Sequence, residues 1–310
     1  MDEIDLSCRF SDKELRYPLL INALTGGTDQ ARRINQGLAE LAGHYGLAMA
    51  VGSQTIALQD PGLRDSFRVV RQANPTGFVI ANLGANSTIS EALAAVQMID
   101  ADALQLHFNI PQELAMQEGD RAFKGVRERV RAIAAECPVP VIAKEVGFGL
   151  SRESVKVLYD CGVRYFDTGG SGGTNFISIE NQRYASWTND LLDWGIPSAA
   201  SLGEICSLDL PITVIASGGI RTALDAVRAM AMGADMVGMA GPLLKIFLRE
   251  GIDKLELWME HFLFALKSVF LMNAAKNLQD IKKQPLIITG TTAEWLRVRG
   301  IDPGRWSNRD

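Results

Sequence analysis

The chain has 310 residues, of which 47% are hydrophobic, and a formal net charge of −5 from interspersed charges of both signs. No basic block or aromatic-basic stripe favours a nucleic-acid partner, and no uncharged apolar run approaches the roughly 18 residues of a membrane span. The acidic first residues show no signal-peptide pattern, so we expect a cytoplasmic protein. Four cysteines without a C-x-x-C spacing indicate free thiols and not a disulfide framework or a zinc site.

Eight short apolar runs recur along the chain, and each ends in a cluster of Gly, Asn, Ser or Lys. They lie at residues 19–27, 47–54, 77–85, 103–109, 139–149, 163–175, 212–219 and 234–241. Runs that are apolar nearly throughout are typical of strands buried on both faces of a parallel sheet.

Amphipathic segments between these runs predict helices at 89–99, 124–136, 151–162 and 221–233, with Ser151 as an N-cap and Gly162 as a stop. The alternation predicts an α/β fold, a closed TIM (β/α)8 barrel over about 19–250, and an open doubly wound sheet is the alternative. Residues 255–275 predict one long amphipathic helix on the barrel exterior or at a subunit contact. Residues 285–300 predict a tail that packs back. We expect residues 1–310 to form a single domain with a C-terminal helical extension over 251–310.

The predicted strands end in residues that suit an active site, because the chemistry of such barrels lies at the C-terminal ends of the strands. The glycines after the seventh and eighth runs expose backbone N–H groups that can hold a phosphate, although glycine at such a turn is often only a turn residue. Lys144 lies within a buried run, which is costly, so it either points at an electron-rich group or makes a structural ion pair. Thr25 and Gly26 leave room for a flat ring. Together these features predict FMN, with Lys144 at the ring edge favouring an anionic reduced flavin.

The fourth run continues into a second group of polar residues. His107 and Asn109 are two positions apart and therefore share one face of the strand, and Gln112 and Glu113 follow. One carboxylate together with substrate phosphate oxygens is the usual way in which proteins hold Mg²⁺. Glu113 is therefore a candidate metal ligand. The alternative is that Glu113 caps a helix and that His107 is a hydrogen-bonded barrel residue.

At this point the sequence resembles a known family, the FMN-dependent type 2 isopentenyl-diphosphate delta-isomerases. The matching segments follow that family's order and are LLINALTGG, AVGSQ, ANLGA, LQLHFNIPQELAMQEGDR, VIAKEVGFG, GGSGGTNFISIEN, DWGIPSAASL, IASGGI and GMAG. Other flavin barrels share the glycines. They do not share the His-x-Asn-x-x-Gln-Glu string followed by Glu-Gly-Asp-Arg.

The resemblance implies a role for each matched residue. FMN would be held by Leu24, Thr25, Gly26, Ser53, Asn82, Lys144, Thr174, Gly218, Gly219, Ile220, Ala240 and Gly241. The substrate would contact Ser53, Gln54, Thr55, His107, Asn109 and Gln112. Glu113 would hold Mg²⁺ against the diphosphate, and Trp194 looks like an aromatic wall over the alkene. The implied catalytic set is Gln112, His107, Asn109 and Trp194.

The resemblance also implies the reaction, an interconversion of isopentenyl and dimethylallyl diphosphate without net redox change. Reduced flavin would act as acid and base, and NADPH would serve only to reduce it. A homo-oligomer of four or eight chains is implied. The family carries an N-terminal basic segment with an Arg-Lys pair that grips the diphosphate, and we expect this chain to lack it. Pro111 and Gln117 also depart from the family pattern, and Pro111 is expected to bias Ile110 to extended geometry.

Two other functions remain as alternatives. One is another FMN barrel oxidoreductase, such as a hydroxy-acid oxidase or a nucleotide dehydrogenase. The first should have a late catalytic histidine and the second a cysteine after the sixth strand, whereas here the loop reads GGSGGTNF and no histidine follows the seventh run before His261. The other is a flavin-binding relative with impaired diphosphate binding.

Overall fold

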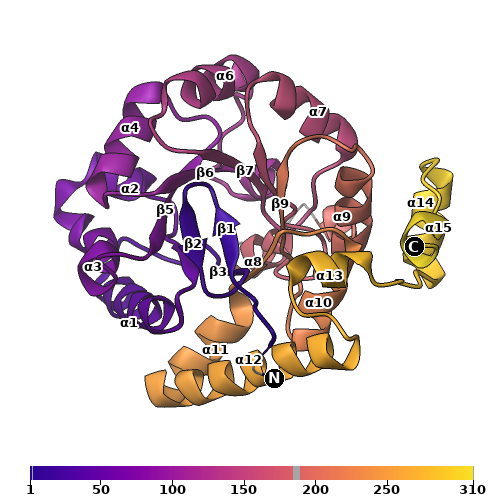
Figure 1. Cartoon of the computed structure of the whole chain (residues 1–310). Helices are drawn as coiled ribbons and strands as arrows, with labels where there is room; N and C mark the ends of the chain where they lie inside the picture. Colours follow the sequence, from indigo (N-terminus) through magenta and orange to yellow (C-terminus); the bar gives the residue numbers. More distant parts are fainter. Residues whose placement is uncertain (2, 184–188, 310) are drawn as a thin grey trace.

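The computed structural model describes residues 1, 3–183 and 189–309, and its centre is a closed barrel of eight parallel strands (Figure 1). The strands in order around the barrel are β3 (Leu19–Ile21), β4 (Ala48–Ala50), β5 (Phe78–Gly84), β6 (Ala103–Phe108), β7 (Val141–Glu145), β8 (Tyr165–Asp167), β9 (Thr213–Ala216) and β10 (Met236–Met239), and β10 pairs again with β3. The predicted barrel is confirmed, and the open doubly wound sheet was the wrong alternative. Most strands are shorter than the apolar runs because the polar residues at their C-terminal ends leave the hydrogen-bonded ladder.

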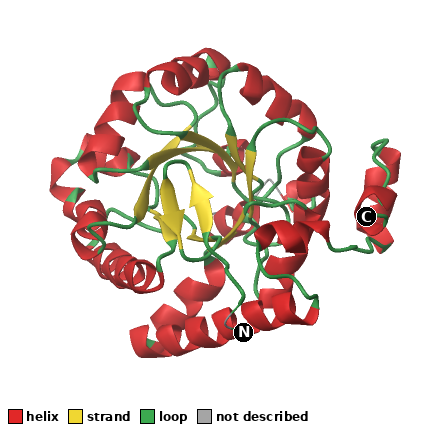
Figure 2. Ribbon diagram, viewed as in Figure 1, coloured by secondary structure: helices red, strands yellow, loops and turns green. Residues whose placement is uncertain are grey.

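The chain has helices between and after these strands, and most of them surround the barrel on the outside (Figure 2). They are α1 (Asp29–Tyr45), α2 (Thr55–Gln59), α3 (Asp65–Ala73), α4 (Ile89–Met98), α5 (Ile110–Ala115), α6 (Val126–Glu136), α7 (Arg152–Asp160), α8 (Phe176–Arg183), α9 (Ser198–Cys206), α10 (Ala223–Met232), α11 (Gly241–Glu250), α12 (Ile252–Met272), α13 (Leu278–Lys283), α14 (Gly290–Val298) and α15 (Gly304–Ser307). Short 3₁₀ helices lie at Pro61–Leu63 and Asn189–Leu191. Ser151 caps α7 as predicted, because its side chain accepts a hydrogen bond from the Ser154 N–H.

A hairpin that the sequence analysis did not predict closes the N-terminal end of the barrel. Its strands are β1 (Cys8–Phe10) and β2 (Lys13–Leu15), which pair antiparallel across the barrel mouth (Figure 1). Phe10 is 1% exposed and packs edge-to-face on Phe78, with ring centroids 5.2 Å apart. Together with Leu15 it joins an apolar cluster inside the barrel. This end is therefore filled with apolar side chains, and only the opposite mouth is free for a site.

The long helix α12 packs against α10 and α11 near the N-terminus of the chain (Figure 1). Its outer side carries three exposed apolar residues at seven-residue spacing, Leu257, Phe264 and Leu271. Neither α12 nor any other helix in the described ranges is long and apolar enough to cross a lipid bilayer. The helix matches the predicted long amphipathic helix, because Leu255, Met259 and Phe262 are buried on its inner face.

The C-terminal tail returns to the barrel and packs on α9 through α14. Trp306 is 1% exposed, and its Nε1 donates to the Met232 carbonyl at 2.8 Å. Glu204 on α9 is also 1% exposed, and it accepts hydrogen bonds from Arg299 Nε at 2.9 Å and from Trp295 Nε1 at 2.8 Å. A buried carboxylate, paired with the partly exposed Arg299, therefore holds the tail against α9, in agreement with the predicted returning segment.

Replacing Arg299 with alanine is expected to lower the free energy of unfolding by about 3 kcal/mol, because it leaves the buried Glu204 carboxylate without its charged partner. Urea denaturation of both proteins measures the difference. The matched control is Arg297→Ala, which removes an exposed arginine from the last turn of α14, two residues before Arg299. Equal effects of the two substitutions would show that the ion pair does not fasten the tail.

Candidate active site

The open C-terminal mouth of the barrel carries a layer of polar side chains above the apolar floor. Inward side chains on a strand lie two residues apart, so the polar residues follow the floor residues at this spacing, as Asn82 follows Ile80 and Lys144 follows Ile142. The polar layer consists of Asn22, Asn82, Gln105, His107, Lys144, Asp167 and Ser217. Polar groups at this depth need hydrogen-bond partners.

A continuous hydrogen-bond network connects most of this layer. His107 Nδ1 lies 2.7 Å from Asn82 Oδ1, and Asn82 Nδ2 donates to Gln105 Oε1 at 3.1 Å. Gln105 Nε2 lies 3.3 Å from Asn22 Oδ1, and Asn22 Nδ2 donates to Asp167 Oδ2 at 2.7 Å. The network thus spans the barrel interior from β6 to β8.

His107 is neutral at pH 7. Burial, with a further contribution from the positive charge of Lys144, lowers the pKa of its imidazole from 6.5 to about 4. A neutral ring has one donor and one acceptor nitrogen.

This depressed pKa of His107 gives a pH prediction. As the pH falls below about 6.5, the unfolded chain binds a proton at His107 while the folded chain does not, so the protein loses stability down to about pH 4. Between pH 7 and pH 5 the wild type is expected to lose about 2 kcal/mol more than His107→Gln does, in urea denaturation. The control is His44→Gln, which should behave as the wild type because His44 is exposed. Identical pH dependence in the wild type and His107→Gln would contradict the neutral imidazole ring.

Lys144 and Glu145 are both 7% exposed. Because they are consecutive residues of β7, their side chains point to opposite faces of the barrel wall. Lys144 Nζ donates to the Glu145 carbonyl at 3.3 Å, and in the described ranges it takes part in no ion pair within 4 Å. Its neighbours across the ladder are His107 and Asp167. The interpretation of Lys144 as half of a structural ion pair therefore has no support.

Glu145 stabilises the loop after β7. Its carboxylate accepts hydrogen bonds from the Phe148 and Gly149 N–H groups, and burial raises its pKa to about 7. In the same loop a Cβ at Gly147 would lie 2.6 Å from the Thr174 carbonyl oxygen. Glu145 thus holds the backbone on which the exposed Thr174 rests.

The glycines after β9 pack against the loop that follows β8. Gly218 and Gly219 have φ of 96° and 91°, and a Cβ at Gly219 would lie 2.5 Å from the Gly172 carbonyl oxygen. Gly241 differs, because a Cβ there would meet nothing within 4 Å. Gly241 is the first residue of α11, and N–H groups in a first helical turn have no partner inside the helix, so this helix end suits a phosphate. With the buried lysine on β7, this donor set fits FMN.

Glycine is needed at position 26 because neighbouring side chains leave no room for a Cβ. A Cβ at Gly26 would lie 2.0 Å from Cζ of Phe67, and one at Gly52 would lie 2.6 Å from the Thr25 carbonyl carbon. Both glycines are therefore required by close approach within the protein. Leu24 and Thr25 remain partly exposed beside them.

The residues after β6 come together in one small pocket at the barrel mouth. His107, Asn109, Glu113 and Asp120 line it, together with Gly84, Ala85, Asn86, Phe108, Ile110, Phe123 and Val126. Asn109 Nδ2 donates to Glu113 Oε1 at 2.8 Å, and the Asp120 N–H donates to Glu113 Oε2 at 2.7 Å. The Glu113 carboxylate is thus held at the pocket edge.

No group of three or more His, Cys, Asp or Glu side chains that could hold a metal lies within residues 1, 3–183 and 189–309. A cation at Glu113 would therefore need oxygens from a substrate or from water.

Gln112 belongs to α5 and faces α8. Its Nε2 donates to Glu180 Oε1 at 3.0 Å, and Glu180 is 2% exposed and also accepts from Arg183 at 2.9 Å. The buried carboxylate orients the Gln112 amide. The sequence analysis did not assign Glu180 a role, although it lies in the matched segment that follows β8.

The expectation for Pro111 was wrong. It was to make Ile110 extended, but Ile110 begins α5 and Pro111 lies in the first turn. A proline is tolerated there because the N–H that it lacks has no partner inside the helix.

The expected role of Gln54 needs correction. Its side chain is 0% exposed and donates to the Ala95 carbonyl on α4 at 3.0 Å, and its Oε1 accepts from the Asn82 N–H at 3.0 Å. It therefore cannot reach a substrate. Ser53 and Thr55 are exposed beside it, with their hydroxyls 3.0 Å apart.

Trp194 lies on the loop before α9 and is 64% exposed. Its N–H donates to the Leu191 carbonyl at 3.0 Å. The structure does not bring its ring against the residues of the pocket. Ile220 and Ala240 are partly exposed beside the glycines that follow β9 and β10.

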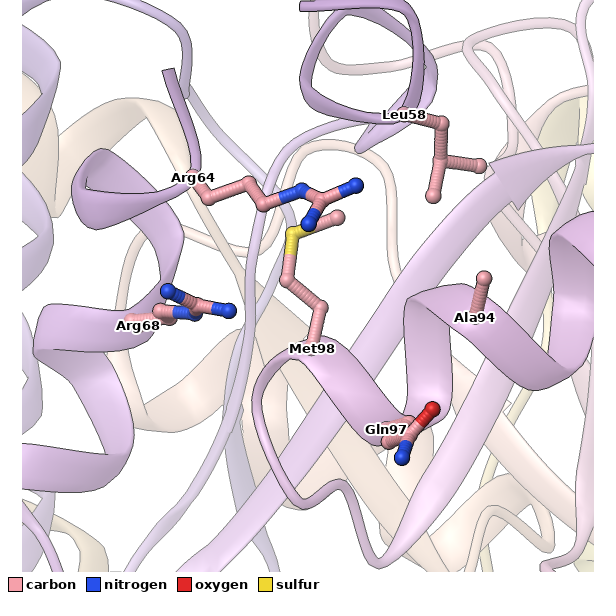
Figure 3. A pocket seen from close by; sticks show the side chains of 6 residues that line it. All are labelled: Leu58, Arg64, Arg68, Ala94, Gln97 and Met98. Carbon is pink, nitrogen blue, oxygen red and sulfur yellow. The ribbon is translucent and has the colours of Figure 1, made fainter. Parts of the chain in front are cut away.

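A larger cavity of about 390 Å³ lies on the outer flank of the barrel, among α2, α3 and α4. Figure 3 shows Arg64 and Arg68 on one side of it and Leu58, Ala94 and Gln97 on the other, with Met98 between them. It contains none of the predicted site residues. The candidate active site is therefore the barrel mouth.

The chain is similar to several known proteins. A family model described as FMN-dependent dehydrogenase matches residues 126–288. An isopentenyl-diphosphate delta-isomerase of Symbiobacterium thermophilum is 46% identical over 310 residues, covering 99% of this chain and 85% of the relative. One from Moorella thermoacetica is 48% identical over 297 residues, covering 96% and 86%.

Among solved structures, a putative lactate oxidase of Pediococcus acidilactici is similar with a TM-score of 0.69, covering 93% of this chain and 80% of that one, at 18% identity. A mandelate oxidase variant is similar with a TM-score of 0.66, covering 90% and 80%, at 15% identity. These two likenesses show a shared fold.

Proposed function

The chain belongs to the isopentenyl-diphosphate delta-isomerase family, and we propose that it interconverts isopentenyl and dimethylallyl diphosphate with the help of reduced FMN. The observation that carries the proposal is the pocket in which His107, Asn109 and Glu113 meet, one strand away from Lys144. A pocket of this kind offers a carboxylate and amides for a metal-bound diphosphate.

FMN, when bound, supplies the acid–base chemistry of the double-bond shift. Its phosphate would bind at Gly218, Gly219 and Ile220 and at the open α11 N-terminus of Ala240 and Gly241. Lys144 would lie at the ring edge. The remaining contacts would come from Leu24, Thr25, Gly26, Ser53, Asn82 and Thr174. The open space at Gly241 and the lone carbonyl partner of Lys144 Nζ support this assignment.

The substrate would lie across the pocket after β6. Glu113 would hold Mg²⁺ against the diphosphate, and His107, Asn109, Ser53 and Thr55 would contact the substrate. Gln112 would position the substrate and would not transfer protons, because an amide is a poor acid. Its orientation is set by the hydrogen bond to Glu180. Trp194 would complete the wall over the alkene only if its loop brings the exposed ring toward the mouth.

We also propose NADPH as the electron source, a cytoplasmic setting and a homo-oligomer of four or eight chains. The exposed stripe of Leu257, Phe264 and Leu271 on α12 supports a contact between copies, since apolar side chains at this spacing form one face.

The alternative of an FMN oxidoreductase is separated from the isomerase by one experiment. The purified chain is incubated with FMN, NADPH and Mg²⁺ without oxygen and given isopentenyl diphosphate, and in parallel it is given lactate or mandelate in air. Formation of dimethylallyl diphosphate without hydroxy-acid oxidation is the expected result. Hydroxy-acid oxidation without isomerisation would overturn the proposal. A flavin-loaded protein inactive in both assays would indicate the relative with impaired diphosphate binding.

A further inference from the structure

We propose that Gln105 is a positioning residue that, with Asn22 and Asn82, fixes the tautomer of His107 with its proton on Nδ1, so that Nε2 enters the pocket as a hydrogen-bond acceptor. The tautomer follows from hydrogen bonds within the chain and is independent of the ligand. Only its consequence for substrate binding rests on the proposed function.

A backbone N–H group determines which atoms donate and which accept in the network. The oxygen and nitrogen of an amide side chain are assigned from their partners, and a backbone N–H can only donate. The Ala23 N–H lies 2.9 Å from the side-chain atom of Asn22 that must therefore be Oδ1. The other atom, Nδ2, then faces the Asp167 carboxylate at 2.7 Å, which is the correct polarity.

The orientation of the Gln105 amide follows from that of Asn22. One atom of its amide lies 3.3 Å from Asn22 Oδ1 and 3.5 Å from Asp167 Oδ2. Because both of these neighbours are acceptors, this atom must be the donor Nε2. Oε1 then faces Asn82 and accepts from Asn82 Nδ2 at 3.1 Å. Because Gln105 is 0% exposed, a reversed amide would have no water to satisfy it.

The last step sets the proton on the imidazole. With Nδ2 of Asn82 directed at Gln105, Oδ1 faces His107 Nδ1 at 2.7 Å. An amide oxygen only accepts, so Nδ1 must carry the proton. In the neutral ring Nε2 is then bare.

The bare nitrogen faces the pocket. A Cβ at Gly84 would lie 3.6 Å from His107 Nε2, and both residues line the pocket with Glu113. The ring therefore accepts a hydrogen bond there, from a protonated phosphate oxygen or a metal-bound water. A proton taken up when an anionic ligand binds goes to Nε2, because Nδ1 already has one.

The test is solid-state ¹⁵N NMR of the full chain with FMN bound and its histidines labelled, at pH 7.5. The chain has three histidines, and His44→Gln and His261→Gln variants identify the His107 signals by elimination. The expected spectrum shows a protonated Nδ1 and an unprotonated Nε2. A proton on Nε2, or an average of the two tautomers, would overturn the proposal, and this outcome does not depend on whether a Gln105 variant folds.

The role of Gln105 is tested with Gln105→Leu, which frees the Asn82 amide to rotate. His107 is then expected to show both tautomers. The matched control is Ser201→Ala, which removes another buried polar side chain, bonded to the Leu150 carbonyl at 2.7 Å, and should leave a single tautomer. If His107 in the Gln105→Leu protein keeps its proton on Nδ1 alone, Gln105 does not fix the tautomer.

Discussion

Replacing Lys144 with methionine is expected to lower the midpoint potential of bound FMN by about 30–60 mV. The Lys144 ammonium is 7% exposed, and its position on β7 directs it into the barrel mouth, where it would stabilise the negative charge of reduced flavin. A hydrogen bond to a charged group contributes about 1.5–3 kcal/mol, and 1.4 kcal/mol corresponds to about 30 mV for a two-electron couple. The isomerisation rate should fall by about tenfold to a hundredfold for the same reason.

Methionine nearly matches the volume of the lysine stem, so the barrel should fold. Spectroscopic redox titration measures the potential, and Lys156→Met on the exposed side of α7 is the control. An unchanged potential in Lys144→Met would mean that the lysine does not lie beside the flavin ring.

Replacing Glu113 with glutamine is expected to raise the Mg²⁺ concentration needed for half-maximal activity by about tenfold to a hundredfold. Glu113 accepts from Asn109 Nδ2 and from the Asp120 N–H, and an amide can satisfy only one of these donors while losing its charge toward the cation. The loss of one charged contact corresponds to about 1.5–3 kcal/mol.

The matched control for Glu113→Gln is Glu118→Gln in the following loop. Glu118 is half exposed, its Oε1 lies 3.6 Å from Nη2 of Arg183, and it is not among the residues that line the pocket. A magnesium titration of both variants separates a specific effect from a general loss of negative charge. If both variants show the same magnesium dependence as the wild type, Glu113 is not the metal ligand.

The barrel could be predicted from sequence because each strand is buried on both faces and is therefore apolar over most of its length. The hairpin of β1 and β2 could not, since each three-residue strand shows only one buried position, at Phe10 and Leu15. Its role depends on a cavity that exists only after the barrel has closed.

Part of the site was predictable for a similar reason. The spacing of His107 and Asn109 and the lysine within a buried run are visible along one segment. The partners of Gln112 and Gln54 are not, because Glu180 and Ala95 lie 68 and 41 residues away and are brought near by the packing of α5 on α8 and of α4 on the barrel. Gln105 lies two residues before His107 on β6 and therefore points to the same inward face. A search of the inward positions of this strand would have found it.

The most direct test of the central claim, an isomerase that uses reduced FMN as acid and base, is isotope incorporation. The full chain with FMN, NADPH and Mg²⁺ is given isopentenyl diphosphate in D₂O without oxygen, NADPH oxidation is followed by absorbance, and the product is analysed by mass spectrometry and NMR. The account predicts dimethylallyl diphosphate that carries solvent deuterium, with no NADPH consumed beyond that which reduces the flavin. NADPH oxidised in proportion to product, or product free of deuterium at every carbon, would contradict it.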